Sequence, residues 1–146
     1  MRPMPLLLTL VLLPITTPAP PALRPPVRPA VVVARFHAPM DEYGAGHRGI
    51  DLRALPGTPV VAPMDGIVTF VGTVAGKDVV SITDGPRIAS MEPVRSALPI
   101  GRWVRSGDVI GTVGQGGHCD HRCVHLGLRV DGTYRPPLTL RARLLP

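Results

Sequence analysis

The chain has 146 residues, a length that supports one modest hydrophobic core rather than two. Its formal net charge is +6, and Lys77 is the only lysine among 16 basic residues. A basic balance suits an anionic polymer, either nucleic acid or a bacterial cell wall. Aromatic residues make up only 3% of the chain, too few for a base-stacking surface, so we expect no nucleic-acid partner.

Residues 1–22 have the layout of a secretory signal: Arg2, an apolar run from Leu6 to Ile15, then small residues and prolines. The apolar run is too short to span a bilayer, so we predict cleavage near Ala19 or Ala22 and no membrane span afterwards. An uncleaved membrane anchor is the alternative. Export favours the cell wall as the anionic partner. Residues 23–30 are Pro-rich and are predicted to form a linker that does not pack, before a single domain at 31–146.

From residue 30 onwards the sequence alternates short apolar runs with Gly, Pro and Asp, and no window of twelve residues has a helical period. We therefore predict an all-β domain with strands near residues 30–36, 58–63, 66–72, 78–83, 102–104, 108–114 and 124–130. Residues 57–72 resemble residues 101–114. This weak duplication predicts a folded-over sheet or sandwich of two related halves. A lipoyl or biotinyl carrier domain also fits it, but Lys77 lacks a carrier lysine's flanking pattern.

The first chemical motif is "GHRGIDL", which contains His47 and Asp51. On a straight strand these residues would lie roughly 13 Å apart, too far to share one ion. Gly46 and Gly49 allow the chain to bend, so that the imidazole and the carboxylate converge. The alternative is a surface histidine in a turn with an aspartate capping nearby.

The second motif is "CVHLGLRV", residues 123–130, which has the alternation of a strand. Cys123, His125, Gly127 and Arg129 share one face. The apolar residues between them form the other face, which we expect to cover the core.

The two motifs together resemble the LytM/lysostaphin-type peptidoglycan endopeptidases, over about residues 32–140. The most specific matching pieces are "GHRGIDLRALPGTPVVAPMDGIVTFVG" and "VRSGDVIGTVG". The resemblance implies that zinc is the cofactor and that His47, Asp51 and His125 are its ligands. Two histidines, one carboxylate and an open position form a normal catalytic zinc set, which would activate water and polarise the scissile carbonyl.

The sequence departs from the family at the two histidines that handle protons. Cys123 replaces the first histidine of the usual His-x-His, and the second slot falls near Glu92. With Cys-x-His at this position, the segment resembles an actinobacterial branch of the family. Glu92 is a candidate general base, and His118 and His121 are alternative proton carriers. For each of the three, a solvated side chain is the competing interpretation. Zinc, and Arg129 on the His125 face, are candidates to hold the oxyanion, although for Arg129 a solvated side chain is the favoured interpretation.

Cys119 and Cys123 are predicted to form a disulfide, because an exported protein permits it and a small closed loop would fix the start of the His125 strand. A second metal site made of these cysteines with His118 and His121 is an alternative. A thiol nucleophile is disfavoured, because no His–carboxylate pair is evident to activate it.

The sequence thus predicts a secreted zinc metalloendopeptidase that hydrolyses peptide bonds in peptidoglycan cross-links. Its partner would be peptidoglycan. The alternative is a catalytically degenerate domain that retains zinc and binds the cell wall or regulates a hydrolase. A third interpretation is a carrier or purely structural β domain, which requires His47, Asp51 and His125 to lie apart.

Overall fold

The computed structural model describes residues 22–41, 44–119 and 121–138, and this part of the chain is all-β. No helix long and apolar enough to cross a bilayer occurs in it. The predicted fold class is confirmed. The strands are β1 (Val32–Ala34), β2 (Gly49–Arg53), β3 (Pro59–Val61), β4 (Gly66–Val74), β5 (Lys77–Asp84), β6 (Arg87–Glu92), β7 (Val94–Arg95), β8 (Trp103–Val104), β9 (Val109–Val113), β10 (Cys123–Val130) and β11 (Thr133–Arg135).

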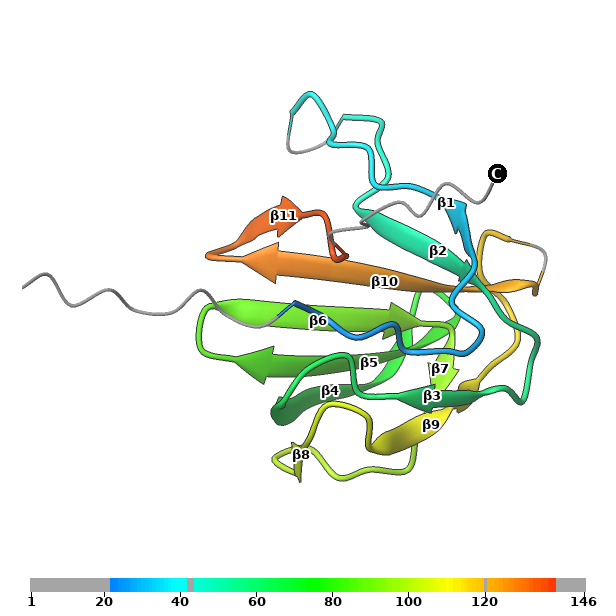
Figure 1. The fold of residues 1–146 in the computed structure, drawn as a ribbon, viewed down its shortest axis with the longest axis vertical. Coiled ribbons are helices and arrows are strands. Elements are labelled where there is room, and N and C mark those ends of the chain that lie inside the picture. The colour runs from blue at the N-terminus through cyan, green and yellow to red at the C-terminus, as the bar shows by residue number, and fades with distance from the viewer. Residues whose placement is uncertain (1–21, 42–43, 120, 139–146) are drawn as a thin grey trace, which may run out of the picture.

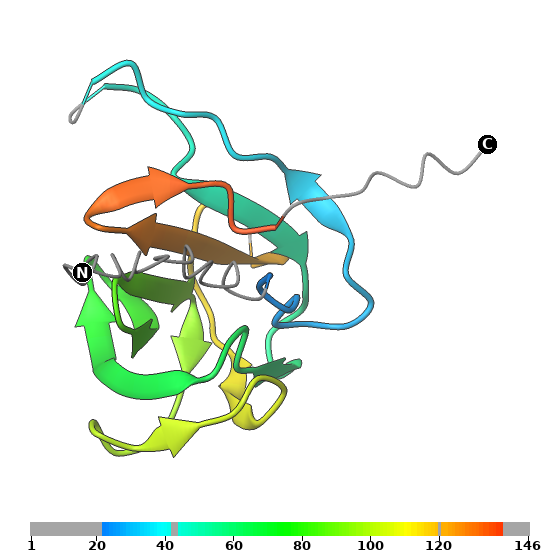
Figure 2. The same ribbon diagram turned by 60° about the vertical axis from the view of Figure 1, so that its left-hand side comes forward.

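The strands form two antiparallel sheets. The larger has the order β1-β2-β10-β6-β5-β4-β8, with β11 also paired to β10, and the smaller has the order β3-β9-β7. Strand β7 follows β6 after Pro93 and carries the chain from the large sheet into the small one (Figure 1). Strands β1, β2, β10 and β11 lie at one end of the molecule and β3, β8 and β9 at the other, as Figure 2 also shows.

The two similar segments pair reciprocally. Residues 57–72 contain β3 and the start of β4, and residues 101–114 contain β8 and β9. Strand β3 pairs with β9 in the small sheet, while β4 pairs with β8 in the large one. Each half therefore gives one strand to each sheet, which is the folded-over arrangement that the duplication predicts.

The hydrophobic core lies between the sheets and contains the apolar face of β10. Val124 and Leu126 are fully buried and Leu128 is 8% exposed, whereas His125 and Arg129 are only partly buried. The alternation predicted for residues 123–130 is therefore confirmed. It fixes which side of the large sheet carries polar chemistry.

The segment 23–30, predicted to be an unpacked linker, packs against the domain instead. Leu23, Pro26 and Val27 are buried, and the last two are less than 2% exposed. Arg24 N–H donates to the Pro63 carbonyl and Val61 N–H to the Pro26 carbonyl, each over less than 3 Å. Proline richness did not prevent packing, because the apolar side chains of the segment reach the core and its backbone forms hydrogen bonds on and just after the edge strand β3. The predicted signal segment lies almost entirely outside the described residues.

We predict that Val27→Ala lowers the free energy of unfolding by about 2 kcal/mol, because it removes two buried methyl groups from the core. Chemical denaturation measures this loss. Val33→Ala is the matched control: Val33 is 47% exposed, so its loss should cost less than about 0.5 kcal/mol. A loss of unfolding free energy in Val27→Ala as small as that expected for Val33→Ala would show that the segment adds nothing to the stability of the fold.

Candidate metal centre

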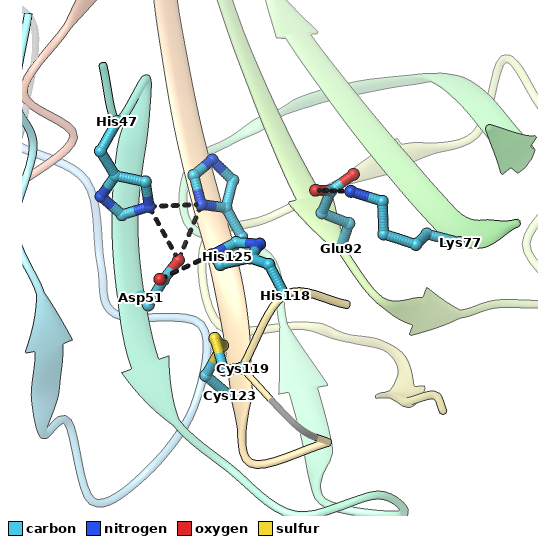
Figure 3. Close-up of a disulfide and its surroundings, with 8 residues drawn as sticks. All are labelled: His47, Asp51, Lys77, Glu92, His118, Cys119, Cys123 and His125. Carbon is cyan, nitrogen blue, oxygen red and sulfur yellow. Dashed lines mark hydrogen bonds and ion pairs between the residues drawn. A yellow bond between two sulfur atoms is a disulfide. The ribbon is translucent and has the colours of Figure 1, made fainter. Parts of the chain in front are cut away.

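Asp51 and His125 are brought together by the pairing of β2 with β10. The two residues are direct partners in this antiparallel register, so their side chains project from the same face. His125 Nδ1 lies 2.8 Å from Asp51 Oδ1. Two motifs that are 74 residues apart in the sequence thus meet at one point (Figure 3).

His47 reaches the same point from just before β2. Its backbone forms a two-way bridge with His37, with N–O distances of 2.9 and 3.0 Å. Its Nε2 lies 3.1 Å from both Asp51 Oδ1 and His125 Nδ1. The chain between His47 and Asp51 is therefore bent, as the intervening glycines allow, rather than straight.

Two glycines make room for this convergence. A Cβ on Gly49 would lie 2.6 Å from His125 Nε2, and a Cβ on Gly46 would lie 2.8 Å from the Pro39 backbone. Distances this short require a neighbour to shift. The absence of side chains at these two positions lets the His125 ring lie against β2 and lets the His47 segment fold close to the chain before it.

Asp51 is a buried carboxylate, only 3% exposed. Burial by itself raises the pKa of its carboxyl group, but hydrogen bonds to His125 and His118 and the nearby imidazoles of His118 and His47 outweigh burial, so the pKa of Asp51 lies below its usual range. Asp51 is therefore an anion at neutral pH.

The hydrogen bonds of His47 fix its tautomer. Its Nδ1 lies 2.7 Å from the Arg35 carbonyl oxygen, which can only accept, so Nδ1 carries the proton. In the neutral ring, Nε2 then presents a lone pair to Asp51 Oδ1. Two lone pairs facing each other at 3.1 Å repel unless a proton or a cation lies between them. A ring nitrogen bound to a backbone carbonyl, with the other nitrogen directed at a shared centre, is the usual arrangement of a metal-ligating histidine.

His118 completes the cluster from the loop before β10. Its Nε2 donates to the second oxygen of Asp51, Oδ2, over 2.7 Å. Its ring centroid lies 5.7 Å from that of His47 and 5.5 Å from that of His125. His47, Asp51, His118 and His125 each offer one ligand atom within 4.8 Å of the others. The His118 side chain is 46% exposed, so it is the solvent-facing member of the group.

The predicted disulfide is present and closes this loop. Cys119 and Cys123 are bonded, with their Cα atoms 5.7 Å apart. The two cysteines are therefore not thiolates, which rules out both the alternative second metal site that used them and the thiol nucleophile. The bond ties the residue after His118 to the first residue of β10 (Figure 3).

His121 is not a member of the four-residue group. Its Nδ1 accepts a hydrogen bond from Gly116 N–H over 2.7 Å, and its φ is +59°. It therefore connects the two ends of the loop that carries His118. This loop contact had no signal in the sequence, where the two loop histidines look equivalent.

Glu92 lies on the opposite side of His125 from Asp51, because it is the direct partner of His125 on β6. Its Oε1 accepts a hydrogen bond from Lys77 Nζ over 2.7 Å, and no hydrogen bond within the described part of the chain joins it to the histidine cluster. The Lys77 contact was missed from the sequence. Arg129 shares the His125 face but lies over the Tyr134 ring, with its Cζ 5.6 Å from the ring centroid.

Comparison with curated proteins finds two kinds of relative. An uncharacterized protein from Mycobacterium tuberculosis is 41% identical over 108 residues, which is 72% of this chain and 42% of that protein. The DD-carboxypeptidase/endopeptidase Mpg of Neisseria gonorrhoeae is 34% identical over 96 residues, 64% of this chain and 22% of that protein. The chain thus matches less than half the length of either relative.

Two solved structures share the fold. The catalytic domain of the prophage-encoded M23 protein EnpA from Enterococcus faecalis has a TM-score of 0.65 and 28% identity, over 79% of this chain and 94% of that one. A zinc-containing peptidase from Vibrio cholerae has a TM-score of 0.64 and 21% identity, over 77% and 38% of the two chains. A family model described as peptidase family M23 matches residues 45–137. This range contains His47, Asp51, His118 and His125 and confirms the lysostaphin-type resemblance: the chain belongs to peptidase family M23.

Proposed function

We propose that this protein is an exported zinc metalloendopeptidase that hydrolyses peptide bonds in peptidoglycan cross-links. The observation that supports it most is the convergence of His47 Nε2, Asp51 Oδ1 and His125 Nδ1, whose mutual distances are 2.8 to 3.1 Å. Membership of a peptidase family supports peptide-bond hydrolysis in general. Zinc as the metal, peptidoglycan as the substrate and export as the location go beyond family membership and are proposed here.

The donor set fits zinc. Zinc bonds of about 2.0–2.1 Å in a tetrahedral site place neighbouring ligand atoms about 3.3 Å apart. The three donor atoms here form a slightly smaller triangle, which an ion would widen by a few tenths of an ångström. Two imidazoles and one carboxylate leave a fourth position open, as in catalytic zinc sites. A bound cation would also remove the repulsion between the Nε2 lone pair of His47 and the Asp51 carboxylate.

The other parts of the proposal have separate support. A relative named a DD-carboxypeptidase/endopeptidase favours a peptide of the cell wall as substrate, and a net charge of +6 suits an acidic wall polymer. The Cys119–Cys123 disulfide favours an oxidising compartment. The signal-like composition of residues 1–22 favours export.

The chemistry that zinc supplies at such a site is Lewis acidity, which polarises a carbonyl group and lowers the pKa of water. The chain's own residues must then move protons, and His118 is the best-placed group. Its Nε2 is held by Asp51 Oδ2, which leaves Nδ1 for a second partner. Because the ring is half-exposed, it can exchange protons with solvent. We therefore assign proton transfer to His118 in preference to His121.

Glu92 remains a second candidate for proton handling. It lies level with His125 across the β6–β10 pair, on the side away from Asp51. Its bond to Lys77 engages one carboxylate oxygen, so a base at this position has to act through the other oxygen or through a water.

A non-catalytic wall-binding or regulatory domain that retains zinc is the second candidate function. One observation favours it: the strand position two residues before His125 is a cysteine engaged in a disulfide, so that position has no proton-transferring group. This candidate predicts zinc binding and wall binding without hydrolysis.

We predict that His125→Ala lowers zinc affinity by more than about 100-fold, since loss of even an outer hydrogen-bond partner of a ligand costs 10- to 100-fold. Metal analysis of the purified protein and digestion of purified cell walls, with and without a chelator, measure zinc and activity together. His37→Ala is the control, because it removes a histidine whose side chain is exposed and keeps the backbone bridge to His47. Unchanged zinc content in His125→Ala would refute the site. Zinc without hydrolysis in the unaltered protein would favour the wall-binding candidate.

We predict that His118→Ala keeps zinc bound but slows hydrolysis about 10²- to 10⁴-fold, the usual contribution of a positioned acid or base. The pH profile of hydrolysis should lose one of its limbs. His121→Gln, a change in the same loop, should slow hydrolysis less than tenfold. Loss of zinc in His118→Ala would make His118 a ligand, and equal effects of the two variants would contradict the assignment.

We predict that the double variant Cys119→Ala/Cys123→Ala lowers the free energy of unfolding by about 2 kcal/mol, the value for so short a closed loop. It should retain zinc, because no ligand is removed, and should lose at least about tenfold in hydrolysis, because His118 is no longer held at Asp51. Denaturation, metal analysis and wall digestion separate the three effects. Full hydrolysis without the disulfide would contradict the role given to the loop.

A further inference from the structure

A groove runs along the large sheet from the metal centre towards the far end of β10. Its volume is about 240 Å³, and His125 lines it together with Glu92, Ser90, Gly127, Arg129 and Tyr134. Arg48, the residue after His47, lines it as well. The groove therefore begins at a proposed zinc ligand and is the natural place for a peptide bound beside it.

The floor of the groove is formed by the paired strands β10 and β6. Three residues of β10 have direct partners on β6: His125 pairs with Glu92, Gly127 with Ser90, and Arg129 with Ile88. A Cβ at Gly127 would meet no atom closer than 3.5 Å. The glycine lies midway between His125 and Arg129 and adds no side chain to the floor of the groove.

Two arginines meet at the end of the groove away from the zinc ligands. The Cζ atoms of Arg48 and Arg129 lie 5.8 and 5.6 Å from the centroid of the same Tyr134 ring. Cation–π contact with a tyrosine holds a guanidinium plane in place. A guanidinium held by its face keeps its N–H groups at its edge, where they can bind a carboxylate with two hydrogen bonds.

Within the described residues, the lining of the groove offsets little of the charge of Arg129. Among the described residues, Glu92 is the only acidic one in the lining, and its carboxylate is already paired with Lys77 at 2.7 Å. Arg48 also donates to the Gly44 carbonyl at 3.3 Å. The Arg129 guanidinium lies over the Tyr134 ring. An anion in the groove would therefore meet positive charge at this end.

We propose that this groove binds a carboxylate of the substrate peptide at Arg129, with Arg48 beside it. The proposal rests on the proposed peptidase function and names its substrate class: peptides that carry a carboxylate near the bond that is cleaved, rather than neutral oligoglycine bridges. Positions 125 and 129 lie about 13 Å apart along the strand, so this carboxylate lies within about four extended residues of the scissile bond. It is either an acidic side chain or the C-terminus of the peptide.

The test measures the binding of defined peptides to the zinc-loaded full chain by calorimetry. The probes are a cross-linked stem-peptide dimer containing diaminopimelate with all carboxyls free, the same dimer with the diaminopimelate carboxyl amidated, and the same dimer with the C-terminal carboxyl amidated. Pentaglycine amide is the neutral probe. We expect the free-carboxyl dimer to bind about tenfold more tightly than one of the two amidated dimers, as expected for one charge-assisted hydrogen-bonded pair. The amidation that weakens binding identifies the carboxylate.

Arg129→Gln should lower the affinity for the free-carboxyl dimer about tenfold. It should change the affinity for the amidated dimer that binds more weakly to the unaltered protein by less than twofold. Arg102→Gln is the matched control, because it removes the same charge from an exposed residue that does not line the groove. Equal weakening of every probe by Arg129→Gln, or no preference for a free carboxyl in the unaltered protein, would overturn the proposal. The peptide arms require no variant, so misfolding of Arg129→Gln leaves the test intact.

The groove proposal and the peptidase proposal can be refuted independently of each other. A carboxylate preference that depends on Arg129, without any cleavage of the dimer, would support the groove and refute the peptidase. Cleavage of the dimer at a rate indifferent to amidation would support the peptidase and refute the groove. Cleavage of pentaglycine amide in preference to the dimer would also refute the groove proposal.

Discussion

The pairing of β2 with β10 is the constraint on which the site depends. It sets Asp51 opposite His125 and leaves Val124 and Leu126 in the core. A slip of one residue in this register would exchange the two faces of β10 and bury the imidazole in place of a leucine. The apolar residues of β10 thus specify the candidate metal centre indirectly, because the register that buries them is the one that brings the two polar motifs together.

The loop before β10 supplies what the strand lacks. Cys123 occupies the polar face at the first position of β10 and is 3% exposed. Its disulfide to Cys119 fixes the residue that follows His118, and His121 fixes the loop's start through Gly116. An imidazole held at two points of a closed loop loses less conformational freedom when it acts than one on an open loop. The loop therefore delivers a third histidine to Asp51 without using the strand.

How much of this could be read from the sequence differs from feature to feature. Valine-rich runs predicted β4, β5, β9 and β10 well, because alternation and β-branched residues are local signals. Strand β6, with Ala, Ser and Met, was not predicted, and the pairing of both its edges, to β5 and β10, explains why it forms.

The same distinction applies to the candidate site. The sequence identified His47, Asp51 and His125 as a group because the family motif carries them. It did not distinguish His118 from His121, nor foresee that Lys77 would reach Glu92, because both depend on contacts between segments that no local pattern encodes. The burial of Leu23, Pro26 and Val27 was missed for a similar reason, because composition describes what a segment prefers alone and not the strand that it meets.

Two acidic residues flank His125 on its neighbouring strands, but only Asp51 is hydrogen-bonded to it. Asp51 on β2 and Glu92 on β6 are both direct partners of His125 on β10, so a carboxylate stands on each side of it. Two such groups around one cation would neutralise it and weaken its Lewis acidity. Lys77, the only lysine in the chain, pairs with Glu92 and so compensates one of the two charges. Asp51 is left to the imidazoles, and the asymmetry between the two sides of His125 follows: the candidate metal ligands gather towards β2, and the groove opens over β6.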